Sequence, residues 1–193
     1  MKIKYNSPTV LTFAFISVVV LILSQTLLSF LTEQWFTAPG RGSFSSGSLR
    51  HWVTLFTHVL GHAHWPHLVS NLSFILLIGP ILEETYGSFS LFIMFCITAL
   101  VTGLLNVLFF SSGLLGASGI VFMLILLASF SNFKKGEIPL TFILVFVLYF
   151  GRELYQFFAS DTRNISMFAH FIGGLIGSLF GFFRVPRVEK TLF

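Results

Sequence analysis

One serine in this chain stands between two glycines at the expected start of an apolar helix. Ser118 lies in the run Gly116-Ala117-Ser118-Gly119, and mainly apolar residues follow it. A hydroxyl at such a place caps the helix, packs against a neighbour, or acts as a nucleophile when a base lies within reach. Phe122 shares the face of Ser118 one turn later and could hold the ring of such a base by stacking. Taken alone, Ser118 fits a helix cap best.

His170 is the residue that could supply the base. It lies inside an apolar run over about 165–183, where an ionisable side chain is costly and faces the protein interior. Gly173 and Gly177 follow on the same helical face, and glycines at this spacing let a neighbouring helix approach closely. If that neighbour carries Ser118, the two residues form a nucleophile and a general base. No Asp or Glu is placed to orient the histidine, so this would be a dyad.

A second polar cluster lies further upstream. Five of the six histidines lie in the stretch 51–67. His67 and Asn71 are four residues apart, so both project from one face at the same end of a helix. Their N–H groups are donors of the kind that stabilise a developing oxyanion, and the backbone N–H of Ser118 at a helix start would join them. Together with Ser118 and His170, these donors suggest serine acyl chemistry.

A metal site is the alternative for the histidine-rich stretch. His58 and His62 are four residues apart, as in some zinc sites. No glutamate follows as in H-E-x-x-H, and no carboxylate lies between Glu33 and Glu83. We therefore expect no metal and no cofactor. The single cysteine, Cys96, lies in an apolar run and is expected to be a packing residue.

The composition requires a helical membrane protein. Of 193 residues, 55% are hydrophobic and 9% are charged, too apolar for a soluble core of this size. Apolar runs of about 20 residues match the thickness of a bilayer core. We expect an all-α, polytopic protein with one membrane domain over 1–193 and a long, partly membrane-embedded first loop over about 32–66. Its six transmembrane helices are expected over about 10–31, 67–86, 89–110, 117–130, 139–158 and 165–183.

Basic residues set the expected orientation. Six helices place both termini on one side, which the positive-inside rule makes the cytoplasm. The basic residues that fall on this side are Lys2, Lys4, Lys134, Lys135, Arg184, Arg187 and Lys190. The expected location is a bacterial-type plasma membrane, with Ser118 near the outer face. The net charge of +4 therefore reflects topology, and the absence of a basic patch excludes nucleic acid as a partner.

Together these motifs resemble the rhomboid family of intramembrane serine proteases, in its minimal six-helix form. The resemblance covers the chain from about His51 to Gly181. Its motifs are G-x-S-G at Gly116–Gly119, A-H-x-x-G-x-x-x-G at Ala169–Gly177, H-x-x-x-N at His67–Asn71 with His62 as the upstream histidine, and E-x-x-x-G at Glu83–Gly87. The chain departs from the family at Val53 and Thr54, where Trp-Arg is frequent, and at Phe122, where Tyr is frequent.

The resemblance implies a serine endopeptidase that cleaves single-pass transmembrane proteins near the outer membrane interface. Substrate would enter laterally from the lipid bilayer, past the fifth helix. The site residues it implies are Ser118 and His170 for catalysis; Asn71, His67 and Ser118 for the oxyanion hole; and Gly116, Gly119, Phe122, Gly173, Gly177 and His62 in support.

Two other functions fit parts of the pattern. A catalytically silent rhomboid-like protein would bind membrane helices without cutting them, and the presence of both Ser118 and His170 disfavours it. A small transporter with an intramembrane histidine should carry inverted repeats, and none is visible. The residues leave open the substrate, the pathway, the oligomeric state, and whether the first loop or the fifth helix gates access.

Overall fold

Every regular element of the described chain is helical. The computed structural model describes residues 4–129, 140, 143–144, 147–148, 151, 155 and 165–183. The helices are α1 (Pro8–Thr26), α2 (Leu31–Trp35), α3 (Leu49–Thr57), the 3₁₀ turn η1 (His58–Leu60), α4 (Trp65–Tyr86), α5 (Ser88–Phe109), α6 (Ser118–Ser129) and α8 (Ile165–Phe183). Among them, α1, α4 and α5 are long and apolar enough to cross a membrane, and α6 and part of α8 are shorter apolar helices. The protein is therefore an all-α, polytopic membrane protein.

The first helix is shorter than expected. The first helix, expected to reach residue 31, ends at Thr26, because Leu28 N–H turns back to the Leu23 carbonyl. The apolar residues that follow extended the hydropathy pattern but do not extend the helix. The long first loop between α1 and α4 carries the short segments α2, α3 and η1. The helix expected over 139–158 lies outside the described residues, apart from seven helical positions.

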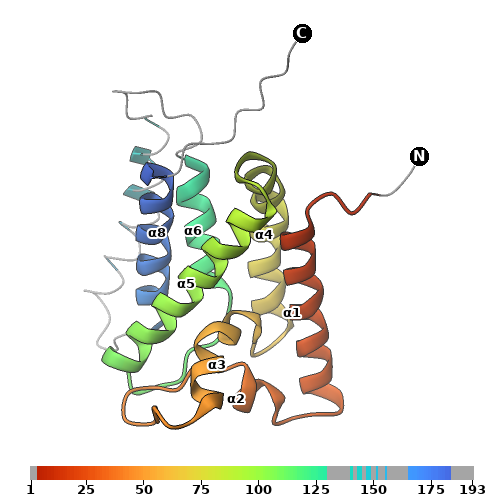
Figure 1. Ribbon diagram of the computed structural model, residues 1–193, viewed down its shortest axis with the longest axis vertical. Coiled ribbons are helices and arrows are strands. Elements are labelled where there is room, and N and C mark those ends of the chain that lie inside the picture. The colour runs from red at the N-terminus through yellow and green to blue at the C-terminus, as the bar shows by residue number, and fades with distance from the viewer. Residues whose placement is uncertain are drawn as a thin grey trace.

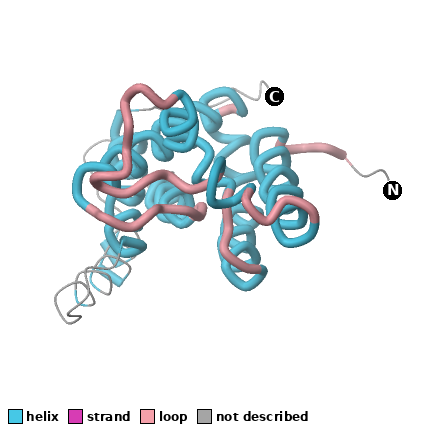
Figure 2. The backbone as a smooth tube through the Cα atoms, turned by 90° about the horizontal axis from the view of Figure 1, so that it is seen from below, coloured by secondary structure: helices cyan, strands magenta, loops and turns pink. Residues whose placement is uncertain are grey.

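α6 lies at the centre of the bundle. Its residues from Gly119 to Leu127 are all buried, and α4, α5 and α8 pack around it. Figure 1 shows α8 beside α6, with the start of α1 and the end of α8 at one end of the molecule and α2 and α3 at the other. Figure 2 views this second end, where loop segments run across the ends of the helices. The candidate serine therefore begins an enclosed helix.

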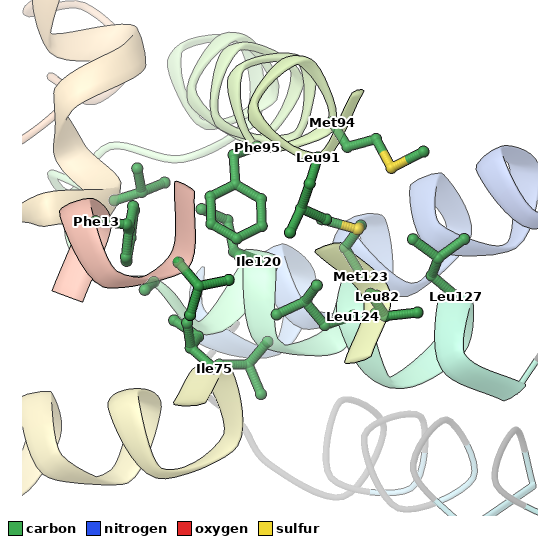
Figure 3. Close-up of a cluster of buried hydrophobic side chains, with 14 of the residues drawn as sticks. Phe13, Ile75, Leu82, Leu91, Met94, Phe95, Ile120, Met123, Leu124 and Leu127 are labelled. Carbon is green, nitrogen blue, oxygen red and sulfur yellow. The ribbon is translucent and has the colours of Figure 1, made fainter. Parts of the chain in front are cut away.

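The apolar core draws its side chains mainly from α1, α4, α5, α6 and α8. Figure 3 shows side chains from α1, α4, α5 and α6 interdigitating in one cluster. Phe13 of α1 meets Phe95 of α5 edge to face, with ring centroids 5.3 Å apart. Ile120 and Leu124 of α6 are fully buried in the same cluster. This packing fixes the position of α6, and with it the serine at its first residue.

Glu83 ties the end of α4 to the start of α1. Its carboxylate is buried and accepts hydrogen bonds from the backbone N–H groups of Thr9 (2.8 Å) and Val10 (3.0 Å). No side chain caps α1 locally at Ser7. Glu83 therefore satisfies the first donors of α1 from a distant part of the chain, where the helix dipole also favours negative charge.

Replacing Glu83 by glutamine should lower the free energy of unfolding by about 2 kcal/mol. The carboxylate accepts two charge-assisted hydrogen bonds, whereas the glutamine oxygen accepts one neutral bond and the amide NH₂ group faces the other backbone donor. Thermal unfolding in detergent micelles measures the change. Glu84 is exposed, so Glu84→Gln is the matched control and should leave stability unchanged. Equal effects of the two substitutions would contradict this role for Glu83.

Candidate active site

Ser118 is the first residue of α6 and does not cap it. The Ala117 carbonyl accepts from the Val121 N–H at 3.0 Å, which makes Ala117 the N-cap residue. The Ser118 side chain is therefore not needed for the start of this helix. Ser118 is half-buried, whereas Ala117 and Gly119 on either side are buried. The cap interpretation, which the serine alone favoured, does not apply.

α6 and α8 touch through their backbones at two glycines of α8. A Cβ atom on Gly173 would lie 2.9 Å from Gly119 Cα, and one on Gly177 would lie 2.9 Å from Met123 Cα. Both distances are shorter than real side chains tolerate. The helical face that carries Gly173 is therefore pressed against the first turn of α6, beside Ser118.

His170 lies one turn before Gly173 and stacks on α6. Its ring is parallel to that of Phe122, with centroids 4.3 Å apart and planes inclined by 8°. Phe122 follows Ser118 by one helical turn, so the two residues share a face of α6. The structure thus brings the imidazole to the side of α6 on which Ser118 lies. Phenylalanine supplies this stacking without the hydroxyl that a tyrosine would add.

His67 and Asn71 lie against the residue two positions before Ser118. Gly116 has φ +115°, and a Cβ there would lie 2.7 Å from both Cε1 and Nε2 of His67 and 3.9 Å from Asn71 Nδ2. Only glycine fits both the backbone angle and the space. Two residues of α4 therefore lie against the backbone that leads into Ser118.

His62 orients the Asn71 amide. Asn71 Nδ2 donates to His62 Nε2 at 3.0 Å, and His62 Nδ1 donates to the Leu60 carbonyl at 3.3 Å. These two bonds require a neutral imidazole with its proton on Nδ1. Both Asn71 and His62 are buried. His62 thus fixes the direction of an amide that lies beside Gly116.

The first loop holds the segment that leads to Ser118. The Gly116 N–H donates to the His58 carbonyl at 2.9 Å, while His58 Nε2 donates to the Ala99 carbonyl of α5 at 3.0 Å. Ala38 and Leu114 exchange two backbone hydrogen bonds of 2.9 Å as an isolated antiparallel bridge. No sequence motif marks these bonds.

His58 and His62 make hydrogen bonds to different helices. His58 reaches α5, whereas His62 reaches α4. Within the described ranges, no three His, Cys, Asp or Glu side chains are grouped to hold a metal. The four-residue spacing places one histidine as the first residue of η1 and the other two residues after its end.

Loop anchoring does not use the Trp-Arg pair that is frequent in rhomboids. Trp52 Nε1 donates to the Ser46 carbonyl at 2.9 Å, which closes the turn before α3. Asn106 of α5 donates to the carbonyls of Pro39 (3.2 Å) and Ser112 (3.1 Å), so one side chain joins the first loop to the serine segment. These contacts anchor the loop with Val53 and Thr54 in place.

The comparisons with known proteins agree with this arrangement. A family model described as a rhomboid domain matches residues 49–187. The chain belongs to the rhomboid family. It is also similar to rhomboid-like protein 11, chloroplastic, of Arabidopsis thaliana, with 31% identity over 96 residues, which are 48% of this chain and 34% of that protein. The chain thus spans about a third of the length of the curated relative it matches.

The rhomboid match covers every residue of the candidate site, from α3 to α8. It also covers the turn between α4 and α5, where Gly87 has φ +84°. Rhomboid membership supports action within the bilayer, as an intramembrane protease or as a rhomboid-like protein.

Stability of this rhomboid should fall as the pH drops from 6.5 towards 4. Burial lowers the pKa of His58 and of His62 from 6.5 to about 4. In this window the unfolded chain binds protons that the folded chain excludes. The free energy of unfolding therefore keeps its full value above pH 6.5 and falls as the pH drops below it. For the fully buried His58 the loss is about 3 kcal/mol.

Chemical unfolding in detergent at several pH values measures this slope. His58→Gln keeps a donor for the Ala99 carbonyl but removes the titrating group, so its slope should be shallower than that of the wild type. The same slope in both proteins would rule out His58 as a source of the pH dependence.

Proposed function

We propose that this rhomboid is an intramembrane serine endopeptidase that cleaves single-pass transmembrane proteins. The observation that carries the proposal is the contact between α6 and α8. It places His170, stacked on Phe122, on the face of α6 that begins with Ser118. A nucleophile and a base on two helices locked together by glycines need no third residue to hold their geometry, because packing does so.

In the proposed reaction Ser118 Oγ attacks the scissile carbonyl and its proton passes to His170. The oxyanion that forms is stabilised by the backbone N–H of Ser118 and by side-chain donors from Asn71 and His67. His170 then protonates the leaving amine, and water hydrolyses the acyl-enzyme. His62 keeps one Asn71 N–H engaged, so the second N–H of that amide is the one directed at the oxyanion.

The location follows from the same proposal. The whole chain forms one membrane domain with six spans, its termini lie in the cytoplasm, and Ser118 lies near the outer face of a bacterial-type plasma membrane. The first loop lies partly in the outer interface, which suits its half-exposed Trp52 and Trp65. Substrate enters laterally, past the fifth helix, and unwinds to present its carbonyl to Ser118.

A fluorophosphonate probe tests the nucleophile directly. We expect labelling of the wild-type protein in detergent or liposomes and none of Ser118→Ala. Labelling that persists in Ser118→Ala, or that never occurs in the wild type, would contradict the protease proposal. In the second case the protein is the silent rhomboid-like alternative, and capture of transmembrane helices without cleavage would then be its activity.

Asn71→Ala should lower kcat by about 10²-fold and change KM little, because an oxyanion-hole donor acts on charge that develops only in the transition state. Cleavage of a model transmembrane substrate in liposomes measures both constants. Asn6→Ala is the matched control, since that amide is exposed before α1 and lies outside the site. A change confined to KM in Asn71→Ala would remove Asn71 from the oxyanion hole.

A further inference from the structure

The Asn71 amide is held by one imidazole, and a single protonation state of that imidazole suits it. Asn71 Nδ2 lies 3.0 Å from His62 Nε2, and His62 Nδ1 lies 3.3 Å from the Leu60 carbonyl. A carbonyl oxygen only accepts, so Nδ1 carries the proton and the neutral ring offers Nε2 as an acceptor. Both side chains are buried, so a mismatched pair of donors there would be costly.

The same nitrogen of Asn71 faces the segment that leads to the serine. A Cβ on Gly116 would lie 3.9 Å from Asn71 Nδ2, which is the closest atom of that side chain. The amide oxygen therefore lies further from this place. Rotation about the last bond of the side chain exchanges the two atoms. This torsion is broad and roughly two-fold, so the exchange needs no movement of the α4 backbone.

We infer that His62 selects which end of the Asn71 amide faces the serine segment, and that a proton on His62 Nε2 reverses the amide. A protonated ring donates from both nitrogens, so the Asn71 NH₂ group would then meet another donor. Turning the amide over gives the new N–H an oxygen to donate to and leaves the bond to Leu60 in place. His62 is thus a positioning residue, which acts through Asn71.

The consequence of the reversal for cleavage rests on the proposed function. With Nδ2 towards Gly116, Asn71 donates to the oxyanion. With Oδ1 in the same place, a lone pair would face the negative charge that develops in the transition state. The reversed amide removes a donor and adds repulsion, so kcat should fall while KM changes little. Acid would therefore switch the protease off reversibly.

Histidines are the ionisable groups that surround His62 in the part of the chain that the structure describes. The ring centroid of His67 lies 5.0 Å from that of His62, and His64 lies 5.9 Å beyond it. His58, at the start of η1, is bonded to α5. Burial, and to a smaller extent the charge of His67, lower the pKa of His62 to about 4. The ring is therefore neutral at pH 7, and the reversal takes place near pH 4.

The pH dependence of kcat for a model transmembrane substrate in liposomes tests the switch. His62→Gln places an amide oxygen where Nε2 accepts, but it does not titrate. Both proteins contain His170, so the ratio of the wild-type kcat to that of His62→Gln cancels the titration of the base. We expect this ratio to fall about fourfold from pH 5 to pH 3.5, from a pKa of about 4. Circular dichroism at each pH shows that both proteins remain folded.

Two further variants serve as controls. His51→Gln removes a histidine that bonds within the first loop, outside the site, and its kcat should keep the wild-type pH profile. His62→Leu removes the acceptor and should lower kcat about tenfold at pH 7, whereas His62→Gln should keep at least about a third of it. A ratio that stays constant down to pH 3.5, or equal kcat values for His62→Gln and His62→Leu at pH 7, would overturn the inference.

Nitrogen-15 NMR of Ser118→Ala in liposomes tests the amide reversal without cleavage and with His62 in place. We expect a proton on His62 Nδ1 alone at pH 7 and on both ring nitrogens at pH 3.5. The Asn71 amide signals, identified by their loss in Asn71→Ala, should shift along the same titration curve. A proton on Nε2 at pH 7, or Asn71 signals that do not follow the titration, would contradict the inference. Fluorophosphonate labelling of the wild type reports the proposed protease separately.

Discussion

His170→Ala should lower the rate of substrate cleavage by at least about 10³-fold, because Ser118 would lose the group that takes its proton. The protein should stay folded, since His170 is only partly buried and its loss leaves the glycine contacts between α6 and α8 in place. Single-turnover cleavage of a model transmembrane substrate in liposomes measures the rate. Fluorophosphonate labelling of Ser118 should slow in parallel.

A double substitution tests whether Ser118 and His170 act as one unit. Two residues that act as a unit are not additive, so Ser118→Ala, His170→Ala and the double variant should share one residual rate. His51→Ala is the matched control: His51 accepts from the Ser45 N–H within the first loop, and its loss should leave cleavage largely intact. A double variant slower than either single variant would show that the two residues act independently.

Gly173→Val should reduce cleavage by at least about 10²-fold without altering either residue of the dyad. The new Cβ collides with the backbone of Gly119, so α8 must move away from α6. A displacement of about 1 Å between nucleophile and base is enough for such a loss. The same overpacking should lower the free energy of unfolding by about 2 kcal/mol.

Leu175→Val is the matched control, because it places the same β-branched side chain on an exposed position of α8. Its stability and cleavage should stay near those of the wild type. Unfolding in micelles and single-turnover cleavage separate the two effects. If Gly173→Val were as active as the wild type, the close approach at Gly173 would have no part in placing His170.

The sequence indicated the pairing of α6 with α8 because the glycine spacing and the intramembrane histidine both mark the same face of α8. The stacking of Phe122 on His170 follows from the same periodicity. These features are local to a helix, where residues three and four apart are neighbours. A single sequence is enough to read such relationships.

The support of the site could not be read in this way. The bonds from His58 to Gly116 and from Asn106 to Pro39 join segments far apart in the chain. They use backbone carbonyls, which every residue carries, so composition does not mark them. The end of α1 at Thr26 was missed for a related reason, since Leu27 and Leu28 are as apolar as the helix before them.

The pairing of α6 with α8 also bears on synthesis. Ser118 enters the membrane before His170, because α8 begins at Ile165, after α6 has ended at Ser129. During that interval α6 lacks the neighbour against which Gly119 and Met123 pack. A growing chain therefore holds a hydroxyl without a base. If the protein is a protease, its biogenesis includes an inert stage, and it cannot cleave neighbouring membrane proteins until α8 is inserted.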